Sequence, residues 1–192
     1  MRFLIISGSP KSEGLTAALQ AELFRGATDG GAEVEVLTLD SFERCHVCGD
    51  GWGECRSTHK CIIDDGFASA QEKIRLADAI ALVTPVYWAE TSELMKGFMD
   101  RLRRCEFAFG AGRQGEDETI LRSKNVILAV NAGGSGNGIN TALAQLERFC
   151  QHTGAVVFDT LGLNRWNHDY KRPAAYAAAK ALASGRRNGV SV

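Results

Sequence analysis

The sequence lacks a charge excess and lacks any long apolar run, and each absence excludes a class of protein. Its 22 basic and 23 acidic side chains give a formal charge of −1, so the basic surface of a nucleic-acid-binding protein is missing. The apolar run at residues 3–6 is much shorter than the core of a signal peptide, and no segment is long enough to span a membrane. We therefore expect a cytoplasmic protein with a small-molecule partner and no nucleic-acid or membrane partner.

Short apolar runs alternate with amphipathic stretches along the 192 residues. The pattern predicts five strands, at residues 3–6, 34–39, 79–83, 126–130 and 156–163. It also predicts five helices, the last one after Pro173, and a polar, glycine-rich loop at residues 106–122. Residues 79–83 are apolar on both faces, as in the centre of a parallel sheet covered on both sides. We expect one domain over residues 1–192, an α/β fold with a doubly wound parallel sheet.

The loop after the first predicted strand has the composition of a phosphate site, and ligands of such sheets bind beyond the carboxyl ends of the strands. It runs from residue 8 to residue 16 at the start of a helix, where backbone N–H groups and hydroxyls hold phosphates. Gly8 and Gly14 fit neither the dinucleotide fingerprint nor the Walker motif, so a terminal monophosphate is the better ligand. The alternative is a turn in which the serines only cap the helix.

Two further loops at the same edge suit a flat ring. Tyr87 and Trp88 follow the third predicted strand and offer an apolar wall, although such aromatics also serve as rim packing or oligomer contacts. Residues 131–138, after the fourth predicted strand, include four glycines, which allow close approach of a ligand or form a flexible turn. Each loop is a weak indication alone, but the three together predict one ligand site.

These loops resemble those of the flavodoxin-like NAD(P)H-dependent FMN reductases, a family that includes iron–sulfur flavoproteins, over about residues 1–160. The matching segments are residues 8–16, residues 84–88 together with 95–101, and residues 132–134. The resemblance implies a flavodoxin-like three-layer sandwich with a five-stranded parallel sheet in the order 2-1-3-4-5. A departure is Leu15, where the family commonly has asparagine, so that only the backbone N–H of this position contacts the phosphate.

The same resemblance implies a set of residues that bind FMN. Those that would hold its phosphate are Ser9, Lys11, Ser12, Leu15 and Thr16. Those that would hold its isoalloxazine ring are Pro85, Val86, Tyr87, Trp88, Ala132, Gly133, Gly134 and Ser135.

A cysteine-rich insert at residues 45–61 follows the second predicted strand. Its cysteines are Cys45, Cys48, Cys55 and Cys61. In the cytoplasm such residues are metal ligands, redox centres or thiols rather than structural disulfides. Similarity to the iron–sulfur flavoproteins implies a [4Fe–4S] cluster here, but the six residues between Cys48 and Cys55 exceed the two-residue spacer of their motif.

Two alternatives to a cluster remain open. Zinc would suit paired cysteines with His46 and His59 nearby. Unligated thiols in an insert that covers the cofactor are the alternative we favour from the sequence. Cys105 and Cys150 lie on predicted helices and are expected in the core.

The expected function is that of an FMN-dependent oxidoreductase, which takes electrons or hydride from NAD(P)H or a reduced carrier and passes them to a quinone or free flavin. No general acid or base is assigned, so no catalytic side chain is named. The alternative is an electron carrier, of flavodoxin type or with FMN and a [4Fe–4S] cluster, although flavodoxin-type carriers tend to be strongly acidic. A receiver-type signalling domain is excluded, because the acidic residues it needs after the first and third strands are absent. The resemblance also implies a homo-oligomer, a dimer or tetramer.

Overall fold

The computed structural model describes residues 1–46, 48, 53–106 and 119–185. Six strands lie in these residues: β1 (Arg2–Ser7), β2 (Glu33–Thr38), β3 (Ala79–Tyr87), β4 (Glu90–Thr91), β5 (Asn125–Ala132) and β6 (Val156–Asn164). Five of them pair in parallel in the order β2-β1-β3-β5-β6, which confirms the predicted sheet and its order. The short β4, which the sequence analysis missed, pairs antiparallel with the end of β3.

The helices of the described residues are α1 (Leu15–Asp29), α2 (Cys55–Thr58), α3 (Phe67–Leu76), α4 (Glu93–Glu106), α5 (Ile139–Thr153) and α6 (His168–Ala183). None of them is long and apolar enough to cross a lipid bilayer. Most of the loop predicted at residues 106–122 and part of the cysteine insert lie outside the described residues.

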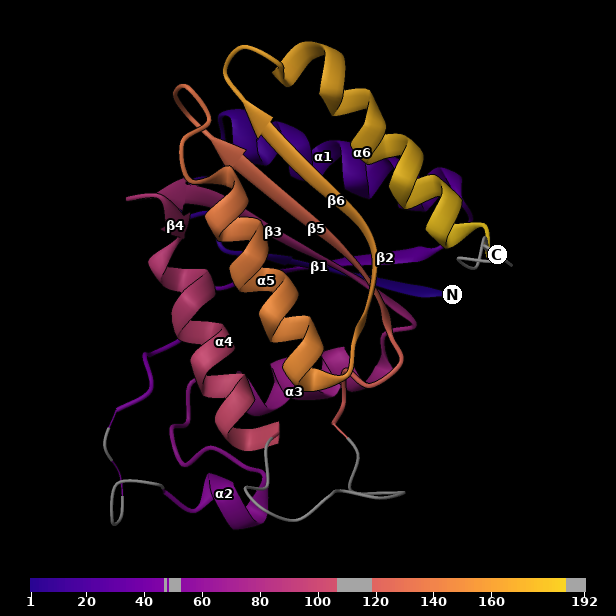
Figure 1. The fold of residues 1–192 in the computed structure, drawn as a ribbon. Helices are drawn as coiled ribbons and strands as arrows, with labels where there is room; N and C mark the ends of the chain where they lie inside the picture. Colours follow the sequence, from indigo (N-terminus) through magenta and orange to yellow (C-terminus); the bar gives the residue numbers. More distant parts are fainter. Residues whose placement is uncertain (47, 49–52, 107–118, 186–192) are drawn as a thin grey trace.

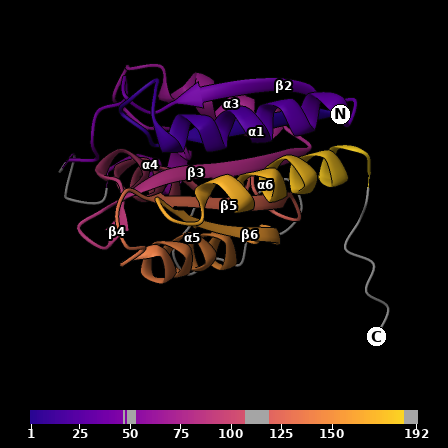
Figure 2. The same ribbon diagram turned by 90° about the horizontal axis from the view of Figure 1, so that it is seen from above.

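Two apolar cores form because alternate side chains of each strand point to opposite faces of the sheet. Phe3 and Ile5 of β1 pack with α1 and α6, whereas Leu4 and Ile6 pack with α3, α4 and α5. Helices α1 and α6 run side by side along their face (Figures 1 and 2). The result is the three-layer flavodoxin-like sandwich expected above, with the carboxyl ends of all five parallel strands at one edge.

Two predicted boundaries are wrong. Strand β3 does not end at Val83 but continues to Tyr87, because Pro85 still pairs with Asn131 of β5 and Tyr87 with Glu90 of β4. Helix α6 begins at His168 rather than after Pro173, which lies inside the helix. A proline near the N-terminal end of a helix removes one backbone hydrogen bond, and packing of α6 against α1 compensates for that loss.

Candidate cofactor site and cysteine site

The predicted cofactor residues all lie at the carboxyl edge of the sheet, in three segments at the ends of β1, β3 and β5. Residues 9–12 follow β1, and Leu15 and Thr16 begin α1. Residues 85–87 end β3, and Trp88 lies in the turn that follows. Ala132 ends β5, and residues 133–135 lead toward α5. In the sheet order the loop after β3 lies between the phosphate loop after β1 and the loop after β5.

Ser92, just before α4, connects the phosphate loop (residues 8–16) to the end of β3 through hydrogen bonds. Its buried Oγ donates to the carbonyl of Gly8 at 2.6 Å and accepts from the N–H of Met95 at 3.2 Å, while its N–H donates to Oγ1 of Thr84 at 3.0 Å. A Cβ on Gly8 would come within 2.8 Å of this Oγ and of Met95 Cβ, so only glycine fits there. Ser92 thus caps the start of α4 and also positions the phosphate loop.

Ser92→Ala is expected to lower the free energy of unfolding by about 1–3 kcal/mol, because it leaves the Gly8 carbonyl and the Met95 N–H buried without their partner. Urea denaturation measures the change. Ser184→Ala is the matched control, since within the described residues its exposed hydroxyl bonds to the Lys180 carbonyl alone, and it should change stability by no more than about 0.5 kcal/mol. Equal losses in both variants would contradict the assigned role of Ser92.

The turn between β3 and β4 consists of Trp88 and Ala89, both with positive φ, 50° and 65°. Positive φ at both central residues is the pattern of a type I′ hairpin, which favours Asn-Gly and disfavours a tryptophan. The Trp88 side chain is 99% exposed. Gly138 lies in the loop of residues 131–138, the glycine loop. It approaches this turn so closely that a Cβ on it would lie 2.3 Å from Cα of Ala89. The aromatic loop, which carries Tyr87 and Trp88, is thus in direct contact with the glycine loop.

A fourth loop, between β6 and α6, joins the site and was missed by the sequence analysis. Asn164 donates from Nδ2 to the Ser135 carbonyl at 3.2 Å and accepts at Oδ1 from the N–H groups of Trp166 and Asn167. His168, buried at the start of α6, has Nε2 3.1 Å from the carbonyl of Leu15. The loop therefore bridges the glycine loop and the phosphate loop. The available signal was the pair Asn164 and Asn167 directly before a helix.

The described residues at this edge fit FMN in two respects. Helix α1 begins after Gly14 with no side-chain cap and no acidic residue in its first turn, so its first N–H groups are available to an anion such as a phosphate. Asn131, 3% exposed at the end of β5, has an Oδ1 without a hydrogen-bond partner in the described part of the chain. A buried polar atom of this kind is costly unless a ligand satisfies it.

The second site lies near the opposite end of α4, beside α2 (Figure 1). One small hollow is lined by all four insert cysteines and, from α4, by Arg101, Arg104 and Cys105. Cys105 is buried, as predicted, but it also hydrogen-bonds to Cys55 of the insert. Burial raises the pKa of Cys45 and of Cys55, and the neighbouring thiols raise both further. Without metal the protonated thiol is therefore favoured at Cys45 and Cys55, and a metal would displace these protons.

The donor chemistry of this site fits a soft metal, because four thiols line one hollow. The side chains are not yet arranged as a ligand set, since no three His, Cys, Asp or Glu of the described residues lie in metal-binding arrangement. The hollow measures about 10 Å³, about the room of one water-sized sphere. A hollow of this size is closer to the room of a single ion than to that of an iron–sulfur cluster, for which the thiols would have to move apart. His59 is engaged with the Cys105 carbonyl at 2.8 Å.

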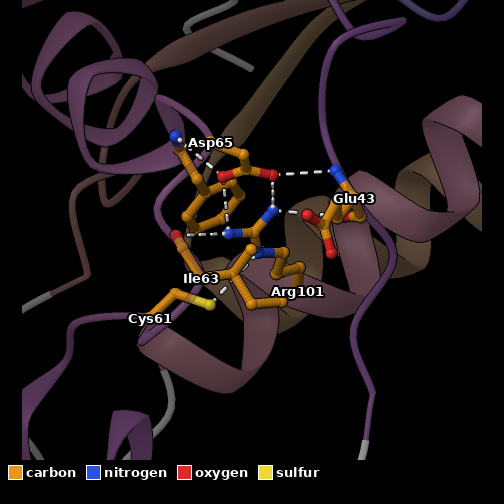
Figure 3. Close-up of polar contacts among 6 residues, drawn as sticks. Glu43, Cys61, Ile63, Asp65 and Arg101 are labelled. Carbon is orange, nitrogen blue, oxygen red and sulfur yellow. Dashed lines mark hydrogen bonds and ion pairs between the residues drawn. The ribbon is translucent and has the colours of Figure 1, made fainter.

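Arg101 of α4 contacts residues on both sides of the cysteine insert (Figure 3). Its guanidinium, 1% exposed, bonds to both carboxylate oxygens of Asp65 at 2.5 and 2.8 Å and lies over the ring of Phe67. Asp65 also accepts from the Phe67 N–H at the start of α3, at 3.3 Å. Its main partner, Arg101, lies 36 residues away and was missed.

The Asp65 pair predicts an acid-dependent loss of stability. Hydrogen bonds from Arg101 hold the pKa of Asp65 below its ordinary value despite partial burial. Its contribution is therefore complete above the unfolded-state pKa of about 3.9 and is lost as the pH falls through the lower folded value. The difference in unfolding free energy between wild type and Asp65→Asn should be constant from about pH 7 to 5 and shrink below about pH 4. A gap that persists unchanged at acid pH would contradict this assignment, and the exposed Glu72→Gln change is the control.

Comparison with known proteins places the chain among flavodoxin-like proteins by sequence. A family model described as a flavodoxin-like fold matches residues 1–185. An iron–sulfur flavoprotein of Methanocaldococcus jannaschii is 33% identical over 134 residues, which are 64% of this chain and 68% of that protein. An iron–sulfur flavoprotein of Methanosarcina thermophila is 32% identical over 143 residues, 72% of this chain and 66% of that protein. The matches thus span about two thirds of these relatives.

Solved structures agree on the fold. RosB, crystallised with 8-demethyl-8-formylriboflavin-5′-phosphate, superposes with a TM-score of 0.72 at 16% identity, over 95% of this chain and 79% of that one. An NAD(P)H:quinone oxidoreductase from Methanothermobacter marburgensis superposes with a TM-score of 0.70 at 16% identity, over 95% and 96% of the two chains. At such identities the similarity concerns the fold.

Proposed function

Because the chain belongs to the flavodoxin-like family, we propose that it binds FMN and works as an FMN-dependent oxidoreductase. The observation that carries the proposal is the pairing, at one sheet edge, of an uncapped helix start at Leu15 with the unpartnered buried Oδ1 of Asn131. One suits the phosphate, and the other suits a polar group of the ring. FMN, when bound, would supply the hydride- and electron-accepting chemistry, and the protein would bind and orient it.

In this proposal each loop has a separate task. First-turn N–H groups of α1 and the exposed Lys11 hold the phosphate. Backbone N–H groups of residues 86–88 face the ring edge, and Trp88 and Tyr87 offer apolar surface to the ring or to the second substrate. Ser92 and His168 keep the phosphate loop in place through Gly8 and Leu15. No side chain is assigned to proton transfer.

The electron donor is proposed to be NADH or NADPH and the acceptor a quinone or free flavin, since the relatives and neighbours include quinone oxidoreductases. The test is FMN titration of the flavin-free chain, followed by steady-state oxidation of NADH and NADPH with quinone as acceptor. Saturable FMN binding with sustained turnover supports the proposal. A chain that fails to bind added FMN would overturn it.

A second candidate is an electron carrier with FMN and a metal centre, which the four thiols around one hollow favour. Anaerobic purification with iron, sulfide and zinc analysis distinguishes the two. FMN binding with iron and no steady NAD(P)H oxidation favours the carrier, and turnover without metal favours the enzyme.

A homo-oligomer remains part of the proposal. The apolar face of α4 is not available as an interface, because Met95, Phe98, Met99 and Leu102 pack into the chain's own core. Trp88, exposed at the turn beside the proposed cofactor site, is an apolar candidate for such an interface. Sedimentation of wild type and Trp88→Ala tests it: a monomeric wild type would remove the idea.

A further inference from the structure

Helix α4 presents two hydrogen-bond donors to the cysteine insert. Arg101 Nε donates to Sγ of Cys61 at 3.2 Å, and Cys105 hydrogen-bonds to Cys55. The two residues are four apart in the helix and so project from the same face. Two of the four insert cysteines are therefore contacted by one face of a helix that belongs to the sandwich and not to the insert.

We propose that Arg101 is the positioning residue of the cysteine site, and that it holds Cys61 where the other three insert cysteines can share a metal ion with it. The inference rests on the metal centre considered under the proposed function. It adds a residue outside the cysteine motif whose contacts determine whether four thiolates or three reach the ion.

The Arg101 guanidinium uses all of its N–H donors in contacts around the cysteine site. An arginine has five N–H donors, and all five are used: Nε to Cys61, Nη1 to the Glu43 carbonyl at 3.1 Å and to Asp65, and Nη2 to the Ile63 carbonyl at 3.2 Å and to Asp65 (Figure 3). Glu43 lies before the first insert cysteine, and Ile63 and Asp65 lie after the last one. One side chain thus joins both ends of the segment that carries all four thiols.

A lysine cannot replace this arginine. It keeps the positive charge but lacks the planar fork, so it would lose most of the five bonds, including that to Cys61. Asp65 and Glu43 also bond to each other, through the Glu43 N–H at 2.7 Å, so part of the segment stays closed in Arg101→Lys. The variant therefore separates the contact with Cys61 from the charge of residue 101.

The full chain, with its thiols reduced, is titrated with Co²⁺, and difference spectra are recorded against the metal-free sample. The thiolate-to-cobalt absorption reports how many thiolates bind the ion. Cys61→Ser should lower the band by about a quarter, one thiolate of four, and Arg101→Lys by about the same fraction. The double variant should lose no more than Cys61→Ser alone, because Arg101 acts through Cys61. Arg75→Lys, at an exposed two-pronged pair with Glu72, should leave the band unchanged.

Additive losses in the double variant, or a full band in Arg101→Lys, would overturn the inference, because Arg101 would then act on overall stability or not at all. If the wild type binds no Co²⁺, the metal centre is overturned, and hydrogen exchange decides the role of Arg101 separately. Amides of residues 53–65 should then exchange about tenfold faster in Arg101→Lys, with α1 and α5 unchanged. Unchanged exchange in that segment would remove the positioning role as well.

Discussion

Replacing Asp65 by alanine is expected to lower the free energy of unfolding by about 3–5 kcal/mol. The change leaves the Arg101 guanidinium, 1% exposed, without its counter-charge. A buried charge without a partner is more costly than the loss of a contact at the surface. Chemical denaturation at neutral pH measures the effect, and Glu72→Ala provides the control, since Glu72 binds Arg75 through the same two-pronged geometry but half exposed.

A double variant, Asp65→Leu with Arg101→Met, refines this test. Removing both charges avoids the unpaired guanidinium, so the double variant should be more stable than Asp65→Ala alone. A loss below about 1 kcal/mol in Asp65→Ala would mean that Arg101 reaches water when its partner is removed. The pair of Asp65 and Arg101 closes the segment that carries the insert cysteines. The double variant would therefore also show whether these two charges contribute to the arrangement of the thiols.

Gly138→Ala is expected to weaken FMN binding by about a hundredfold or more and to cost about 3 kcal/mol of stability. The residue has φ +87°, and its Cβ would lie 2.3 Å from the backbone of Ala89, which cannot turn aside as a flexible side chain can. The aromatic and glycine loops would therefore have to separate, and the proposed ring site lies between them. Fluorescence titration with FMN and thermal denaturation measure the two effects.

Gly97→Ala is the matched control for this variant. Gly97 lies inside α4, and a Cβ there would have only an Arg44 carbon at 3.9 Å, so alanine should raise stability by up to about 1 kcal/mol through its helix propensity. FMN affinity that is equal in Gly138→Ala and wild type would show that the contact between the two loops does not contribute to cofactor binding.

The sheet could be predicted because its strands are short, apolar and buried. Ile80 to Val83 are fully enclosed, and such runs separated by amphipathic helices leave one sheet topology as the natural solution. Strand β4 could not be predicted, because two residues, Glu90 and Thr91, carry no periodic signal. Pro85 likewise reads as a strand end, since proline lacks an N–H, yet β3 continues through it at the carboxyl edge.

The sites were only partly predictable. Loops after parallel strands meet at one edge, so the three predicted cofactor loops follow from the fold. Contacts between distant residues leave no local trace: Arg101 is 36 residues from Asp65, and His168 is 153 residues from Leu15. Cys105 is a good example of the limit, because its apolar helical position predicts burial correctly but says nothing of the thiol that it touches.

The turn at Trp88 and Ala89 sets stability against activity, so that selection for thermal stability alone would change it. Two non-glycine residues with positive φ store backbone strain of about 1 kcal/mol or more each. Selection for heat resistance alone would favour Asn-Gly there, which relaxes the hairpin and deletes the most exposed aromatic side chain at the proposed active edge. A library screened by melting temperature should therefore accumulate changes at residues 88 and 89 that raise stability while catalysis falls, and a screen that also requires flavin turnover should keep the strained pair.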